Sequence, residues 1–157
     1  MNSHAQEFCQ RTADLITTEE VQSMSQWKHH GDISTLDHSI FVAYTSYRIA
    51  LRFGWDAQAT ARGGLLHDLY LHNAREKTRR KQCFEHPRVA AENADAITKL
   101  TERERNIILS HMWPCGGPMP RYKEAWLVAM VDTFCATLEL MGFCNPARLR
   151  AKLSTAQ

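Results

Sequence analysis

The chain has 157 residues, of which 44% are hydrophobic and 23% charged, a composition that fits one globular domain and argues against a disordered chain. Its formal net charge is only +2, and its basic residues are scattered except between Arg75 and Lys81, so a general nucleic-acid-binding surface is not indicated. Its five cysteines include no Cys-x-x-Cys pair, which argues against a disulfide framework and a zinc ribbon.

The first residues lack the apolar core of a signal peptide, and no stretch approaches the roughly 20 apolar residues of a membrane span. No linker-like tract divides the chain. We therefore expect a single domain over residues 1–157, in the cytoplasm, with a small molecule as its partner rather than nucleic acid or a membrane. The sequence leaves the oligomeric state open.

Helical periodicity runs along most of the chain, and no sustained polar and apolar alternation indicates a strand. The sequence therefore predicts an all-α bundle of about six or seven helices. One helix is expected to begin near Thr18, and the others to span about 35–53, 56–71, 87–100, 101–112 and 123–141. Gly54 is the predicted end of the first long helix, Pro87 lies in the first turn of a later one, and Thr101 to Glu104 form a capping box.

The two long helices, 35–53 and 123–141, are expected to cross in the core. The second of them looks buried on most sides, because apolar residues flank Asp132 before and after it. A buried aspartate needs a strong partner, since an unpaired carboxylate is costly to remove from water.

Four of the eight histidines, His38, His67, His86 and His111, stand where neutral imidazoles could converge. His67 is followed by Asp68 at the end of an apolar helix, so a second carboxylate is expected in an apolar setting. A metal ion would remove the cost of burying it. Together with Asp132, these residues offer imidazole and carboxylate only, a set suited to iron, manganese, zinc, nickel or magnesium and unlike a thiolate site.

Between Trp27 and Glu139 the sequence resembles the HD-domain superfamily, which implies an HD-domain helical bundle. The resemblance rests on three motifs: Leu36-Asp37-His38-Ser39-Ile40-Phe41-Val42-Ala43, Gly64-Leu65-Leu66-His67-Asp68 and Val131-Asp132. They imply a single-metal site of His38, His67, Asp68 and Asp132. His86 before Pro87 and His111 within Ile108-Leu109-Ser110-His111-Met112-Trp113-Pro114 match the two extra histidines of the dinuclear branch. By that analogy Asp68 bridges two metal ions, with iron or manganese favoured.

The chain also departs from this superfamily. The dipeptide is followed by Leu69-Tyr70-Leu71-His72 instead of the Ile-Gly-Lys of many phosphohydrolases, and a familiar phosphate-contacting lysine is missing. The Gly-Tyr-Pro signature of cyclic dinucleotide phosphodiesterases is absent, which disfavours that activity. A small substrate is therefore expected.

The favoured function is metal-dependent hydrolysis of a small phosphoester or nucleotide, with Asp68 at the catalytic centre and a metal-activated water as nucleophile. The resemblance leaves a diiron oxygenase open as the alternative, and a metal-bound regulatory module as a third class. Candidate substrate-binding residues are Arg88, Arg121, His30 and His72. Neither of these two histidines has a neighbouring carboxylate that would mark a general base, so the imidazoles are expected to act as ligands.

Overall fold

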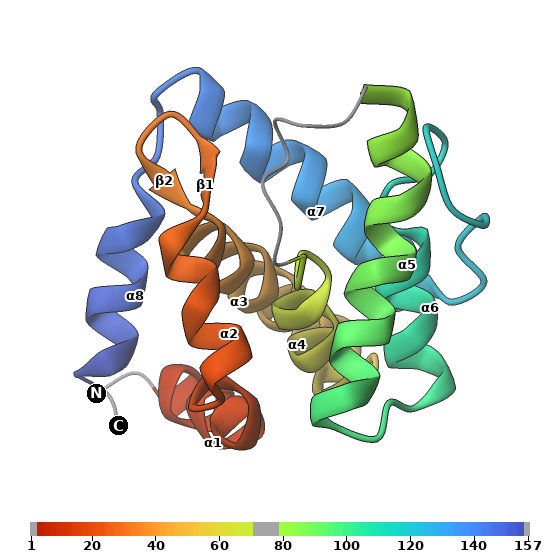
Figure 1. The fold of residues 1–157 in the computed structure, drawn as a ribbon. Helices are drawn as coiled ribbons and strands as arrows, with labels where there is room; N and C mark the ends of the chain where they lie inside the picture. The colour runs from red at the N-terminus through yellow and green to blue at the C-terminus, as the bar shows by residue number, and fades with distance from the viewer. Residues whose placement is uncertain (1–2, 71–78, 156–157) are drawn as a thin grey trace.

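The computed structural model describes residues 3–70 and 79–155, and in this part of the chain it shows eight α-helices and one small hairpin (Figure 1). The all-α class predicted from the sequence is confirmed. The elements are α1 (Ser3–Ile16), α2 (Glu19–Ser23), a 3-10 turn η1 (Met24–Gln26), β1 (Lys28–His30), β2 (Ile33–Ser34), α3 (Thr35–Phe53), α4 (Ala57–Leu66), α5 (Arg79–Ile97), α6 (Glu102–Ser110), α7 (Lys123–Leu140) and α8 (Pro146–Ser154). None of the described helices is long and apolar enough to cross a membrane.

Helix α3 is the centre of the fold, and it has the bounds predicted from the sequence. Ser34 caps its first turn by accepting a hydrogen bond from the backbone N–H of Asp37, and Gly54 ends it in the left-handed conformation at φ 65°. The helix packs against α4, α7 and α8, and Figure 1 shows it running behind α2 and the hairpin. The predicted crossing of the two long helices is confirmed, because α3 packs against α7.

Two glycines let α4 approach both of its neighbours closely. A Cβ at Gly64 would lie 2.9 Å from the Cα of Ala43 in α3, and a Cβ at Gly63 would lie 2.9 Å from the side chain of Ile107 in α6. Backbone atoms cannot move aside, so α3 and α4 reach this distance only with glycine at residue 64. The close approach places the residues that follow α4 deep between α3 and α6, where Leu65 is fully buried as expected.

Helix α5 is longer at its N-terminal end than the sequence predicted. It begins at Arg79, so Pro87 lies inside the helix and not in its first turn. Proline cannot donate to the carbonyl four residues earlier, that of Cys83. This carbonyl faces Gly116, where a Cβ would clash with it. The loop after α6 therefore covers the gap that Pro87 leaves in the helix.

Helix α7 differs from its prediction in burial. Its bounds agree within one residue, and Val131 is buried, but the helix is not buried on most sides. Trp126, Met130 and Phe134 are all exposed. Apolar residues therefore occupy both faces of α7, and only the face with Asp132 is turned towards the rest of the molecule.

The ends of the chain contain two helices that the sequence analysis did not predict. Helix α1 precedes α2, whose Thr18 cap is as expected, and α8 follows α7. The two helices meet where the thiol of Cys9 lies 3.6 Å from the carbonyl oxygen of Leu153. The hairpin was also not predicted, because its strands of three and two residues are too short to show alternation.

Candidate metal centre

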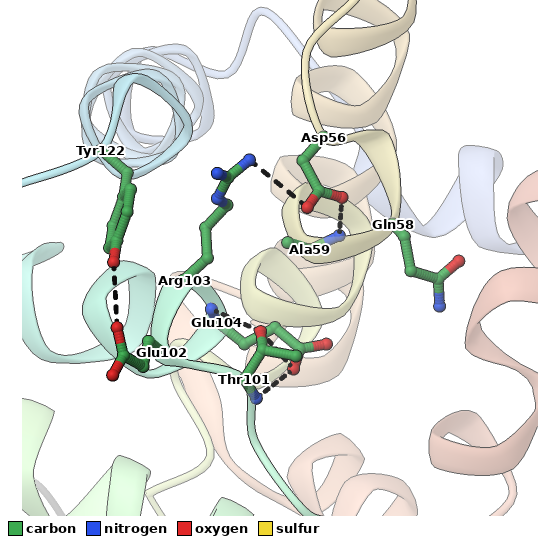
Figure 2. A pocket seen from close by; sticks show the side chains of 8 residues that line it. All are labelled: Asp56, Gln58, Ala59, Thr101, Glu102, Arg103, Glu104 and Tyr122. Atoms are coloured by element: carbon green, nitrogen blue, oxygen red, sulfur yellow. Dashed lines mark hydrogen bonds and ion pairs between the residues drawn. The ribbon is translucent and has the colours of Figure 1, made fainter.

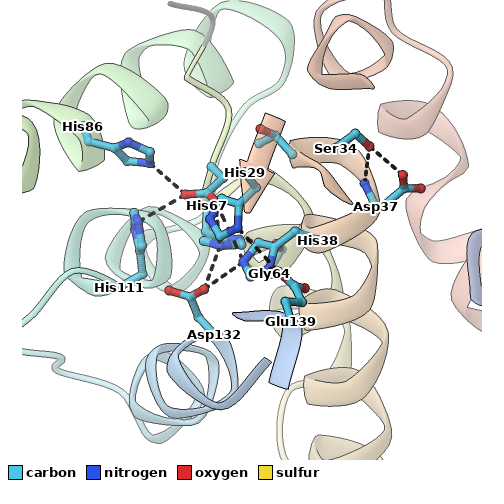
Figure 3. A network of polar contacts seen from close by, with 12 residues as sticks. His29, Ser34, Asp37, His38, Gly64, His67, His86, His111, Asp132 and Glu139 are labelled. Atoms are coloured by element: carbon cyan, nitrogen blue, oxygen red, sulfur yellow. Dashed lines mark hydrogen bonds and ion pairs between the residues drawn. The ribbon is translucent and has the colours of Figure 1, made fainter. Parts of the chain in front are cut away.

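The structure brings the six predicted ligands together from five separate places in the chain (Figure 3). They are His38 in the first turn of α3, His67 and Asp68 directly after α4, His86 within α5, His111 directly after α6, and Asp132 in α7. In Figure 3, His86 and His111 lie on the left of the cluster, Asp132 lies below it and His38 lies on the right. Side chains that are far apart in the sequence therefore converge on one buried cluster.

One half of this cluster is formed by His38, His67 and Asp132 around one oxygen of Asp68. His38 Nε2 lies 2.9 Å from Asp132 Oδ1 and 3.9 Å from Asp68 Oδ2. His67 Nε2 lies 3.5 Å from Asp68 Oδ2 and 3.6 Å from Asp132 Oδ1. Two ligands about 2.1 Å from one shared ion lie at most about 4.2 Å apart. All four of these separations are within that limit, so the four atoms are close enough together to contact one ion.

The other half is formed around the second oxygen of Asp68. His86 Nε2 lies 2.7 Å from Asp68 Oδ1, and His111 Nε2 lies 3.5 Å from the same atom. The two carboxylate oxygens of Asp68 thus face different histidines, with His86 and His111 on the side of Oδ1.

The backbone sets the tautomer of two of these histidines in the same way. His67 Nδ1 lies 2.6 Å from the carbonyl oxygen of Gly64, and His111 Nδ1 lies 2.7 Å from that of Ile108. Each carbonyl belongs to the last turn of a helix, where it has no partner within the helix. Because a carbonyl only accepts, each Nδ1 carries a proton, and each Nε2 is the ring nitrogen that turns a lone pair towards the cluster when the ring is neutral.

These two Nε2 atoms provide a test of whether a metal fits the cluster. Both are buried, and neither has a hydrogen-bond partner among the described residues. A buried nitrogen with a free lone pair is costly unless something binds it. A divalent cation between His67, His111 and the carboxylates would bind both lone pairs, so the residues present fit a metal centre.

Two further residues of the cluster were not among the predicted site residues. Glu139 is buried in α7, and its two carboxylate oxygens lie 2.9 and 3.0 Å from His38 Nδ1. His29, on β1, stacks on the ring of His38 with centroids 3.8 Å apart, and its Nε2 lies 3.3 Å from Asp68 Oδ2. Glu139 accepts the Nδ1 proton of His38 and so directs Nε2 towards the cluster.

The cluster strongly favours ionised carboxylates. Burial raises the pKa of Asp68 and Asp132, but the neighbouring histidines outweigh burial and hold both pKa values well below the usual range. Burial also raises the pKa of Glu139, but hydrogen bonds from His29 and His38 outweigh burial and lower this pKa to about 2. Three carboxylates therefore carry charge within one small volume.

The histidines respond to these charges differently in the two halves. Burial lowers the pKa of His67, but the carboxylates of Asp68 and Asp132 outweigh it and raise this pKa to about 9. His29 follows the same balance and reaches a pKa of about 10. For His111, burial dominates and its pKa is lowered. Without a cation, protons on His29 and His67 offset part of the charge of the three carboxylates.

The predicted substrate-binding residues do not gather at the cluster. Arg88 pairs with Glu92 on the exposed side of α5, and Arg121 lies over the ring of Tyr122 in an exposed loop. His72 and the side chain of His30 lie outside the described part of the chain. Of the two adjacent histidines on β1, the structure places His29 in the cluster.

A surface pocket of ≈ 370 Å³ lies elsewhere, between α4, α6 and Tyr122 (Figure 2). Its charged groups pair with one another: Arg103 contacts Asp56 at 3.4 Å, and Tyr122 donates to Glu102 at 3.3 Å. None of the cluster residues lines it. The groups that could hold a metal are therefore those of the His and Asp cluster and not those of this pocket.

A model of the HD domain family matches residues 35–137, a segment that holds all six predicted ligands. The chain belongs to the HD domain family. HD domains bind divalent metals and form a superfamily of metal-dependent hydrolases, in keeping with the two unpartnered Nε2 atoms of His67 and His111. Searches of curated proteins and of solved structures gave no significant match to this chain.

Proposed function

We propose that this HD domain is a phosphohydrolase that cleaves a small phosphoester or nucleotide with two divalent metal ions, iron or manganese being preferred. The observation that carries the proposal is the position of Asp68, whose two oxygens face separate groups of histidine ligands. Two ions about 3.5–4 Å apart are the usual arrangement for in-line displacement at phosphorus.

The residues around Asp68 have distinct roles in this proposal. His38, His67 and Asp132 hold the first ion, and His86 and His111 hold the second. When bound, the ions lower the pKa of a coordinated water and neutralise charge on the phosphoryl oxygens. The protein's own contribution is to fix the ligand atoms: Gly64 and Ile108 orient His67 and His111, while Glu139 orients His38.

The exposure of the cluster supports a substrate that presents one end to it. The side chains of His38 and His67 are completely buried, whereas those of Asp132, His86 and His29 are 15–22% exposed. Solvent therefore reaches the cluster at these three side chains. A terminal phosphoryl group fits such an opening better than the middle of a polymer does.

The experiment compares three forms of the protein: wild type, His111→Ala and His38→Ala. Each is purified, its bound metal is counted by mass spectrometry, and its hydrolysis of p-nitrophenyl phosphate and a set of mononucleotides is measured before and after chelation. We expect two ions in the wild type, one in His111→Ala, and loss of hydrolysis with chelator that manganese or ferrous iron restores.

His38→Ala should lose the first ion, and both variants should lower the rate by at least about 100-fold, because each removes one ion from a two-ion site. Hydrolysis that survives complete removal of metal would contradict the proposal. So would an iron-loaded protein that cleaves none of these esters and consumes oxygen with a small organic substrate.

A further inference from the structure

The outward side of α7 forms an unusual apolar surface, which we call the outer face. Its members share an arc of about 120° on the helix, because residues three, four and seven positions apart lie on one side. They are Trp126, Met130, Thr133, Phe134, Thr137, Leu140 and Met141, all of them exposed. Met130 and Leu140 are 68% and 69% accessible to solvent.

The outer face continues beyond the ends of α7. At one end the ring of Trp113 packs edge-on against Trp126, with centroids 4.9 Å apart, and at the other Phe143 is 72% exposed. Taking about 150–250 Å² for each large side chain, the exposed part amounts to roughly 600–1,000 Å². Apolar patches on monomers rarely exceed roughly 600 Å², and a stable dimer buries roughly 800 Å² on each partner.

Charge is absent from the outer face. The acidic residues of α7 are Glu124, Asp132 and Glu139, and all three lie on its inner side, where two are buried and Asp132 reaches the metal cluster. The only basic residue is Lys123, at the first position of the helix. A strongly charged partner would therefore gain no ion pairs across most of this surface.

We propose that the outer face pairs with the same face of a second copy of this chain. A two-fold axis places the same surface of each copy against the other, so apolar residues meet apolar residues and no charge is buried without a partner.

A lipid surface is a poorer occupant of the outer face. Amphipathic helices that lie in a membrane interface carry several basic residues on the side turned to water. The opposite side of α7 packs instead against α3 and α6. Pairing through the outer face leaves the metal clusters of the two copies turned away from each other, because Asp132 and Glu139 project from the other side of α7.

The test is the molecular mass in solution, by sedimentation velocity and light scattering from about 1 to 100 µM, for wild type and two variants. The double variant Met130→Asp with Phe134→Asp places carboxylates in the centre of the outer face. Phe84→Asp is the matched control, because Phe84 is 59% exposed against 60% for Phe134 and lies on α5, which packs on α4 and α6. Helical content and bound metal are measured for all three proteins.

We expect wild type and Phe84→Asp to have twice the 18.0 kDa mass of the chain, and the double variant to have that mass itself with unchanged helical content and metal. A wild type that stays monomeric at 100 µM would overturn the proposal, as would a double variant that is still dimeric. Binding of monomeric wild type to vesicles of phosphatidylcholine and phosphatidylserine, lost in the double variant, would assign the face to a membrane instead.

Discussion

The metal cluster and the surface pocket at Arg103 both gather charged side chains, but they balance those charges in different ways. In the pocket, Arg103 lies 3.4 Å from Asp56 and 3.2 Å from Glu124, so a permanent cation meets the carboxylates. In the cluster, three carboxylates have only histidines as their described partners. The carboxylates of the pocket already have a permanent cation as their partner and need no added ion. Those of the cluster face histidines that can lose their protons, so the cluster is suited to bind a metal cation.

The largest effect that separates the two regions should come from removing one aspartate from each. Asp68→Ala deletes the proposed bridge, so both ions should be lost and phosphoester hydrolysis should fall to background. Asp56→Ala should keep full metal content, because Asp56 lies outside the cluster, where it caps α4 by accepting from the N–H of Ala59 and pairs with Arg103. Its expected cost is about 1 kcal/mol of stability. Metal analysis and thermal unfolding of the two variants measure this contrast.

Removing the metal from the wild type should be the next largest effect. An ion present at a hundred times its dissociation constant stabilises the folded state by about 2.7 kcal/mol, and a second ion adds to this. We expect a chelator to lower the unfolding temperature of the wild type by several degrees and to leave that of Asp68→Ala unchanged. Equal shifts in the two proteins would mean that the chelator acts somewhere other than the cluster.

The chelated protein should also respond to pH with a definite sign. The carboxylates of Asp68 and Asp132 outweigh burial and raise the pKa of His67 to about 9, so its proton is bound more tightly in the folded state. The stability that this proton contributes is fully present below pH about 6.5 and is lost as the pH rises through about 9. Thermal unfolding from pH 7 to 9.5 should show a steeper decline with chelator than with saturating manganese. A metal-free protein whose stability rises over this range would contradict the balance of charges described for the cluster.

Glu139 should have a smaller effect, because it acts on the metal through His38. Residues that orient a histidine ligand usually change metal affinity by about 10–100-fold. We expect that range for Glu139→Ala, measured by competition with a fluorescent chelator, and a smaller loss for Glu139→Gln, whose amide oxygen still accepts from His38 Nδ1. If both variants bind metal as the wild type does, Glu139 does not position His38.

These comparisons also show what the sequence could predict. The ends of α3 were predictable because Ser34 and Gly54 are local capping signals, and the capping box at Thr101 was found for the same reason. The start of α5 was not, because Pro87 is typical of a first turn, and the loop at Gly116 that packs against the Cys83 carbonyl is distant in the sequence. Features set by neighbouring residues in the sequence could be predicted, whereas features that depend on contacts between distant segments could not.

The same distinction between local and distant signals applies to the candidate metal centre. The family resemblance and the cost of burying carboxylates pointed to the residues that the structure brings together. Glu139 could have been found, because it lies seven residues after Asp132 and therefore on the same side of α7. The choice between His29 and His30 could not be made, because neighbouring strand residues point to opposite faces and the sequence does not show which face is inward. Likewise, the apolar sequence of α7 does not reveal that one of its sides is exposed.

The smallest expected effect is in the pocket, and it sharpens the comparison by asking whether the pocket takes part in the reaction. Tyr122→Phe removes the hydroxyl that donates to Glu102 over 3.3 Å at an exposed position. It keeps the aromatic ring that lies 5.2 Å from the guanidinium of Arg103. An exposed hydrogen bond contributes little, because water replaces it, so the variant should unfold within about 0.5 kcal/mol of the wild type. Metal content, kcat and KM for a phosphoester should also be unchanged. If KM instead rises several-fold while metal content stays the same, the substrate contacts this pocket at Tyr122. The pocket would then take part in the reaction and would not be a purely structural region.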